Sequence, residues 1–360
     1  MSLFTGSYRA EDTVFLLKPM DMDKVDVAAK ERLIQSSQRH YSELLAPERV
    51  PNPRYLALFE ALTARYAGRL AAEIMALAQY LVVSRPRQIT VVSLARAGTP
   101  IGALLVRALQ QQGRTDARHY SISIIRDRGI DENALQFILR RDGREPAGLA
   151  FVDGWTAKGV ITAELHRALK HWNARQPEQL DEALYVVSDI GGVADVAATY
   201  DDYAIPSGIL NATVSGLTSR SILNAAIGPR DFHGCVFYAE FAPHDRSIWF
   251  LDQVASHFVT AIPLPVRCDL EERWERRQAM SAFLTRLHAR YCVGDRNFIK
   301  PGVAEATRVL LRRLPDLLLL RDPDEPDVEH LRLLAEEKRV SVIVDPTMPI
   351  QATALIKDLS

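Results

Sequence analysis

The 360-residue sequence is poor in the features that mark secreted and membrane proteins. It has only three cysteines, which stand far apart without CxxC spacing, so it contains neither a disulfide framework nor a cysteine-based zinc motif. No apolar run approaches the roughly 18 residues that a membrane helix needs, and the N-terminus lacks the basic start and apolar core of a signal peptide. We therefore expect a cytoplasmic protein with no contact to a membrane.

An excess of charge of one sign is also missing. The chain has 44 Lys and Arg residues against 45 Asp and Glu residues, a formal net charge of −1. This balance argues against nucleic-acid binding over the whole surface and leaves only a local basic patch open. With 48% hydrophobic and 25% charged residues, the composition is typical of a globular protein with two or three domains.

A regular alternation of short apolar runs with helix-length segments predicts the fold of the central part. Such a pattern is typical of a doubly wound parallel sheet with helices on both faces. Ligands of these sheets bind beyond the carboxyl ends of the strands, so the loops at that edge are the first place to look for a site. The four expected strands cover residues 88–94, 119–125, 148–153 and 183–189.

The pattern divides the chain into four parts. Residues 1–85 are expected to form an N-terminal helical cover, and residues 86–266 the doubly wound domain with an irregular, turn-rich hood inserted from about 190 to 265. Residues 267–296 are expected to form a linking helix. Residues 297–360 predict a small α/β domain that alternates helix and strand and ends in a helix over 352–359.

The first two loops at the sheet edge combine small residues with arginines. The loop after the first strand can cradle a pyrophosphate with backbone N–H groups, while Arg96 adds a fixed positive charge. The loop after the second strand carries Arg126, which either faces a ligand or pairs with Asp127 on a solvated turn. The expected ligand contacts of the first loop are Ala95, Arg96, Ala97 and Gly98.

The third loop has the composition of a phosphate site. We expect the strand to stop at Asp153 and a helix to begin at Val160, so that the helix N-terminus faces the same place as the loop amides. Lys158 supplies a positive charge, and Trp155 either stacks on a ligand or packs beneath the loop. The expected ligand contacts here are Gly154, Trp155, Thr156, Ala157, Lys158 and Gly159.

This order of strands and loops resembles the type I phosphoribosyltransferases. The resemblance implies a phosphoribosyltransferase-like fold, phosphoribosyl diphosphate as a phosphorylated substrate, and Mg²⁺ held by Asp153, with Arg96 and Arg126 beside Asp153 in catalysis. It also implies transfer of ribosyl phosphate to an acceptor. The sequence departs from the family motif at Gly154, which replaces a second acidic residue, and at Lys158 and Ile161, which replace two threonines.

The whole chain more closely resembles a divergent bacterial group from tellurite-resistance and stress gene clusters. Its members look like phosphoribosyltransferases with a C-terminal Pelota-type RNA-binding domain. In the run that begins the first helix of that domain, Gly302 and Glu305 match and Ala304 replaces an asparagine. Eleven Lys and Arg against six Asp and Glu over residues 267–313 make this the basic region of the chain. The expected RNA contacts are Lys300, Gly302, Arg308 and Arg312.

Two alternatives to a transferase remain. One is a catalytically silent module that binds nucleotide or RNA, which Gly154 favours. The other is a cysteine protease, because the same group is also identified with StiP-type cysteine proteases. His233 and Cys235 stand two apart on an expected strand and would share a face. Since Cys235 begins an apolar run, we interpret it as a core residue.

Overall fold

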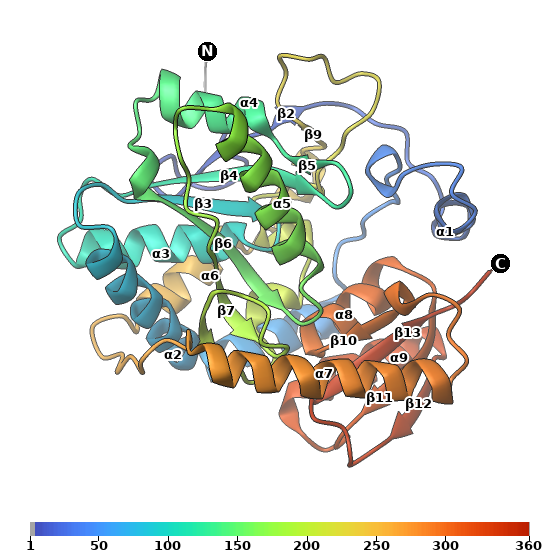
Figure 1. Ribbon diagram of the computed structural model, residues 1–360. Helices are drawn as coiled ribbons and strands as arrows, with labels where there is room; N and C mark the ends of the chain where they lie inside the picture. The colour runs from blue at the N-terminus through green and yellow to red at the C-terminus, as the bar shows by residue number, and fades with distance from the viewer. Residues whose placement is uncertain (1–3, 360) are drawn as a thin grey trace.

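The computed structural model describes residues 4–359 and shows a mixed α/β architecture (Figure 1). The central sheet has the strand order β1-β4-β3-β6-β7-β8, with every neighbouring pair parallel, and β5 pairs antiparallel with β4. The mostly parallel sheet is therefore confirmed. The strands are β1 (Val14–Leu16), β3 (Thr90–Ala95), β4 (Arg118–Ile125), β5 (Gly129–Ile130), β6 (Leu149–Thr156), β7 (Leu184–Asp189) and β8 (Val196–Thr199).

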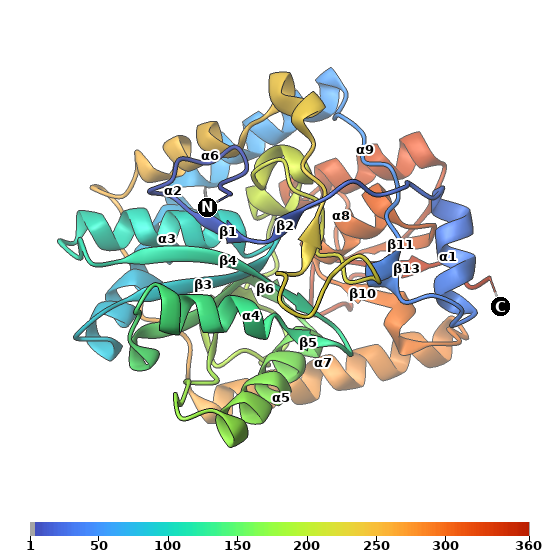
Figure 2. The ribbon, with the colours of Figure 1, turned by 90° about the horizontal axis from the view of Figure 1, so that it is seen from above.

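Helices cover both faces of this sheet (Figure 2). Successive strand residues point to opposite faces, so Val91 packs in one core cluster and Val92 in the other. One face carries α2 (Pro53–Ser84), α3 (Thr99–Gln111) and α6 (Ser247–Ala255), and the other carries α4 (Glu132–Gln136) and α5 (Val160–Arg175).

The N-terminal part is more than a helical cover. Its strand β1 joins the sheet beside β4, and β2 (Lys18–Pro19) forms a two-stranded ladder with β9 (Gly234–Cys235). The helix α1 (Val27–Gln35) lies against the C-terminal domain, where the Arg313 guanidinium pairs with the buried Glu31 carboxylate.

The hood is irregular, as expected, and its predicted strand after Gly234 is only two residues long. Most of the hood consists of turns and short 3₁₀ helices. These are η4 (Pro206–Gly208), η5 (Ala212–Val214) and η6 (Ala239–His244).

The C-terminal domain has a four-stranded sheet in the order β10-β13-β11-β12. The predicted final helix is wrong, because residues 352–356 form a strand between β10 and β11. All five of its residues are buried, and a short buried apolar run has no periodicity that separates strand from helix. The elements are β10 (Ile299–Pro301), α8 (Val303–Arg312), β11 (Pro315–Leu320), α9 (Glu329–Lys338), β12 (Ser341–Val344) and β13 (Ala352–Ile356).

The C-terminal domain is closely docked on the rest of the molecule. Val303 and Val309 of α8 belong to the same buried cluster as Ile205 and Ile209 of the hood. The long helix α7 (Leu270–Arg290) runs along both parts (Figure 1). Among residues 4–359, no helix is both long enough and apolar enough to cross a membrane.

Candidate functional site

The strand β6 continues beyond the point where it was expected to stop. Instead of ending at Asp153 it runs to Thr156, since Trp155 and Thr156 still pair with β7. The turn is therefore confined to Ala157–Gly159, and Gly159 adopts a φ of 73°, which favours glycine, before α5 begins. Only the end of the predicted phosphate loop is a loop.

This end of β6 contacts helix α8 of the C-terminal domain. The Trp155 indole Nε1 donates to the Glu305 carboxylate at 3.2 Å, and the Arg308 guanidinium lies 4.5 Å from the centre of the Trp155 ring. Arg308 also donates to Glu305 at 2.9 Å. Trp155 thus packs between the two domains.

Lys158 makes a second bridge between the domains. Its ammonium group donates to the backbone carbonyls of Arg296 at 3.0 Å and Ile299 at 2.8 Å. The residues predicted to bind phosphate and those predicted to bind RNA are therefore neighbours. The structure brings the two predicted sites together at one place, where β6 points toward α8 and β10 (Figure 1).

Several cations crowd into this junction. Burial, followed by the charge of Lys300, lowers the pKa of Lys158 to about 7. Burial also lowers the pKa of Lys300, and burial with the charges of Arg96 and Arg308 lowers that of Arg312. Mutual repulsion therefore acts among these groups, which we call the cationic cluster: Arg96, Arg126, Lys158, Lys300, Arg308 and Arg312.

The two predicted catalytic arginines already have protein partners. Arg96 is only 6% exposed, pairs with Glu48 at 2.6 Å, and donates to the carbonyl of Thr218 at 2.5 Å. Arg126 pairs with Asp127 at 3.0 Å and lies over the Tyr41 ring. Both contacts are typical of structural arginines.

The predicted RNA contacts differ in their surroundings. Arg312 donates to the Asn211 side chain, whereas the side chain of Arg308 remains 27% exposed. Gly302 has a φ of 94° and serves as a backbone turn before α8.

Asp153 does not fit a magnesium site. Burial raises the pKa of its carboxyl group to about 7, and its Oδ1 accepts a hydrogen bond from the Gly154 amide at 2.7 Å. Its charged neighbours are Arg308 and Glu305, which are already paired with each other. Within residues 4–359, no three His, Cys, Asp or Glu side chains form a metal-binding group. The residues present do not provide the carboxylates that Mg²⁺ requires.

A second polar group lies beside Cys235. The His233 imidazole Nδ1 is 2.7 Å from the Ser123 hydroxyl, and the His233 amide donates to the Asp131 carboxylate at 2.6 Å. Burial raises the pKa of Asp131 and lowers that of His233. His233 was among the residues predicted from the sequence, but Ser123 and Asp131 were not. Their only signal in the sequence is their position, near the end of β4 and directly before α4.

Cys235 itself is fully buried, as expected of a core residue. Burial raises the pKa of its thiol to about 12, and the side chain belongs to the main apolar cluster. Cys268 and Cys292 are exposed.

Comparison with known proteins gives three matches. Residues 6–255 match the family model of the tellurite-like stress resistance cysteine protease StiP, and residues 278–358 match that of the PELOTA RNA binding domain. The chain is also similar to the "Cysteine protease StiP" of Acinetobacter baylyi, with 42% identity over 368 residues that cover 99% of this chain and 95% of the relative.

These matches correct the predicted activity. The relative and the family are named as cysteine proteases, so the predicted phosphoribosyltransferase reaction is wrong, and the alternative of a protease is the better one. The expected links to tellurite-like stress resistance and to a Pelota-type domain are confirmed. The chain belongs to the StiP family of tellurite-like stress resistance cysteine proteases and carries a PELOTA RNA binding domain at its C-terminal end.

Proposed function

We propose that this chain is a cysteine peptidase whose nucleophile is Cys235. One observation carries the assignment: residues 6–255, which match the family named as a protease, contain no cysteine other than Cys235. Cys268 and Cys292 both lie outside this range. The thiolate that such a peptidase needs therefore has a single source within the family segment.

His233 is the base that this proposal requires. His233 directly precedes β9 and stands two residues before Cys235, and residues two apart in an extended segment share a face. The Ser123 hydroxyl orients the ring. Burial lowers the pKa of His233 and so favours the neutral imidazole that can accept a proton, while the charge of Asp131 opposes part of that shift. A cysteine and a histidine are the reacting groups of a thiol protease. Here a serine hydroxyl contacts the histidine ring, and the Asp131 carboxylate holds the backbone amide of His233.

The described conformation is a resting form, because its thiol is shielded. A pKa of about 12 leaves on the order of one thiol in 10⁵ ionised at neutral pH. The strand that carries Cys235 is held by a short backbone ladder, in which the Lys18 amide donates to the His233 carbonyl at 2.9 Å and the Met20 amide to the Cys235 carbonyl at 2.8 Å. On its other edge the Gly234 amide donates to the Ile222 carbonyl at 2.8 Å. Opening this ladder would bring the thiol to water and lower its pKa.

The chemistry then follows from these two side chains. His233 takes the thiol proton, and the Cys235 sulfur attacks the carbonyl carbon of the scissile peptide bond. The imidazolium returns the proton to the leaving amine as the C–N bond breaks. Water, deprotonated by His233, then hydrolyses the thioester and restores the thiol.

The proposal is tested by measuring the peptidase activity of three variants, each with one cysteine replaced by alanine. Cys235→Ala is expected to abolish hydrolysis of a denatured protein substrate, whereas Cys268→Ala and Cys292→Ala should retain it. Iodoacetamide labelling followed by mass spectrometry should modify the two exposed cysteines first and Cys235 only under conditions that give activity. Full activity of Cys235→Ala would exclude this cysteine as the nucleophile.

We further propose that the C-terminal domain binds RNA phosphates at the cationic cluster. The supporting observation is that Lys158, Lys300 and Arg308 lie together where the Pelota match meets the end of β6, with lowered pKa values at both lysines. Phosphates placed there would relieve the repulsion among these cations.

Fluorescence anisotropy with a labelled single-stranded RNA at 50 and 200 mM salt tests this second proposal. Arg308→Gln should weaken binding and reduce the salt slope by about one. Arg332→Gln, on the exposed side of α9 in the same domain, is the matched control. Equal binding by both variants would show that RNA does not use the cluster.

A further inference from the structure

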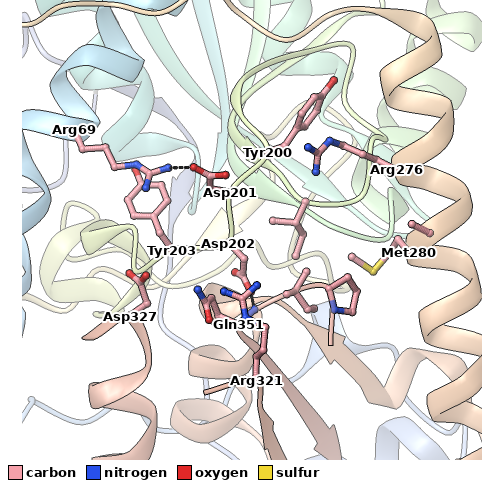
Figure 3. Close-up of a pocket in the computed structure, with 14 residues that line it drawn as sticks. Arg69, Tyr200, Asp201, Asp202, Tyr203, Arg276, Met280, Arg321, Asp327 and Gln351 are labelled. Carbon is pink, nitrogen blue, oxygen red and sulfur yellow. Dashed lines mark hydrogen bonds and ion pairs between the residues drawn. The ribbon is translucent and has the colours of Figure 1, made fainter. Parts of the chain in front are cut away.

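A cavity of about 320 Å³ lies between the family domain, helix α7 and the C-terminal domain (Figure 3). Its walls come from α2, from the segment after β8, from α7 and from the turn before β13. Its volume is at the lower end of the range for small-molecule sites, so the molecule that fits it is small. It lies apart from Cys235 and from the cationic cluster, with which it shares no residue.

Two guanidinium groups in this cavity lack a close carboxylate. Arg276 of α7 stacks on the Tyr200 ring at 4.2 Å, its Nε is buried without a partner, and its nearest carboxylate is Glu272 at 3.8 Å. The side chain of Arg321 has no hydrogen bond or ion pair with any residue that the structure describes. Figure 3 shows Arg276 extending from α7 toward Tyr200, and Arg321 on the side of the cavity where Asp202 and Gln351 lie. A carboxylate is the group that a guanidinium binds in two-point contact.

The two carboxylates that line another part of this cavity, Asp202 and Asp327, have no basic side chain as a partner among the residues that the structure describes. Asp202 accepts from backbone amides, and Asp327 accepts from the Ala204 amide and from the Tyr66 hydroxyl. Burial, to which the charge of Asp327 adds, raises the pKa of Asp202 to about 6. Arg69 is occupied by Glu73 and Asp201, at 2.9 and 2.7 Å. A ligand ammonium would fill this gap.

Unpartnered polar atoms and apolar walls complete the description. The Tyr200 hydroxyl, on a residue only 6% exposed, and the Gln351 side-chain oxygen are both buried without a hydrogen-bond partner. The remaining wall is apolar and consists of Ile190, Ala279, Met280, Pro349 and Ile350.

We propose that this interdomain cavity binds a small zwitterion, namely a free α-amino acid with an apolar side chain. The ligand carboxylate lies between Arg276 and Arg321, its ammonium group faces Asp327 and Asp202, and its side chain contacts Met280 and its apolar neighbours. Because the walls come from both domains and α7, the ligand stabilises their docked arrangement. The proposal does not depend on the peptidase assignment.

Titration calorimetry of the full chain with L-leucine tests the inference. Leucine should bind, while 4-methylpentanoate, which lacks the amine, and isoamylamine, which lacks the carboxylate, should each bind at least about tenfold more weakly. Arg321→Gln and Arg276→Gln should each weaken leucine binding about tenfold or more, and Asp327→Asn should do so through the ammonium group. Arg286→Gln, an exposed arginine on the same helix, is the control and should bind as the wild type does.

The melting temperature of each variant without ligand shows whether it is folded. Arg276→Gln and Arg321→Gln test the carboxylate contact independently, so the test still holds if one of them fails to fold. No heat with leucine or methionine at about 10 mM, a concentration far above the dissociation constant of a specific site, would overturn the proposal. Equal binding of leucine and 4-methylpentanoate would also overturn it, because the site would then recognise only an anion.

Discussion

Asp153 and Lys158 lie at the end of the same strand and titrate in opposite directions. Burial raises the pKa of Asp153 to about 7 and lowers that of Lys158 to about 7. Each folded-state value therefore favours the neutral form of its side chain. Ionising either residue in the folded protein therefore costs free energy. A structural ion pair would show the opposite, with a lowered pKa for the aspartate and a raised pKa for the lysine.

The titration of Asp153 predicts a specific change in stability. The pKa of Asp153 in the folded protein is above the unfolded value of 3.8. The contribution of this carboxyl group to the free energy of unfolding is therefore complete below about pH 4 and is lost as the pH rises through 7. Because asparagine does not ionise, Asp153→Asn avoids this loss of stability at high pH, and its side-chain oxygen can still accept from the Gly154 amide. We expect the variant to be more stable than the wild type at pH 8 by about 1–3 kcal/mol, after allowance for solvent screening, and equal at pH 4.

Urea unfolding at the two pH values measures this difference. Asp316→Asn, an exposed carboxylate of the C-terminal domain, is the control and should change the unfolding free energy by less than about 0.5 kcal/mol at either pH. A loss of stability in Asp153→Asn at pH 8 would mean that the ionised carboxylate is stabilising.

At the scale of elements, helix α8 depends on a residue from outside its own domain. Its N-cap position is Gly302, which has no side chain to cap the helix. Asp202 of the hood takes that role, accepting from the amides of Val303 at 2.8 Å, Gln351 at 2.9 Å and Ala352 at 3.4 Å. One carboxylate therefore caps the helix and also binds the start of β13.

Removal of this carboxylate should weaken the docking of the C-terminal domain. Asp202→Ala leaves three amides without their acceptor, and we expect a loss of about 2–3 kcal/mol in the free energy of unfolding. Asp201→Ala, one residue earlier, removes only an exposed partner of Arg69 and should cost less than about 1 kcal/mol. Equal effects in urea unfolding would refute the capping role.

At the scale of the whole molecule, the two matched regions share one core. The buried cluster that contains Leu318 and Leu334 of the C-terminal domain also contains Phe59 and Leu77 of α2. Helix α7 is also held to the central domain by an ion pair, since the Arg273 guanidinium lies 3.0 Å from the carboxylate of Asp195, directly before β8. Large shared apolar interfaces couple the unfolding of neighbouring domains.

We therefore predict one cooperative unfolding transition for the full chain. Calorimetry should give a single peak, and a proteolytic nick in the exposed segment that carries Val259 and Ile262 should leave the two pieces associated in gel filtration. Two separate peaks, or release of the C-terminal piece under native conditions, would show that the domains fold independently.

Much of the architecture could be predicted from the sequence because it depends on short-range patterns. The apolar runs that became β3, β4, β6 and β7 alternate with helix-length segments, and that alternation is enough to indicate a parallel sheet. The same pattern placed Asp153 and Lys158 at its carboxyl edge. It failed where periodicity carries no information, as in β13, whose residues are all buried. The resemblance to a transferase rested on the order of strands and loops and on the composition of the loops, which many chemistries share.

By itself, then, the sequence determined most helices, most strands, the edge at which the loops gather and the family. Only the tertiary structure decided what those loops contact. Trp155 meets Glu305 across 150 residues of sequence, and Asp131 meets His233 across 102. It also decided that the Ser123 hydroxyl lies against the His233 ring. Local patterns cannot encode such contacts, because burial and charge depend on which distant surfaces pack together, and those surfaces take shape only when the whole chain has folded.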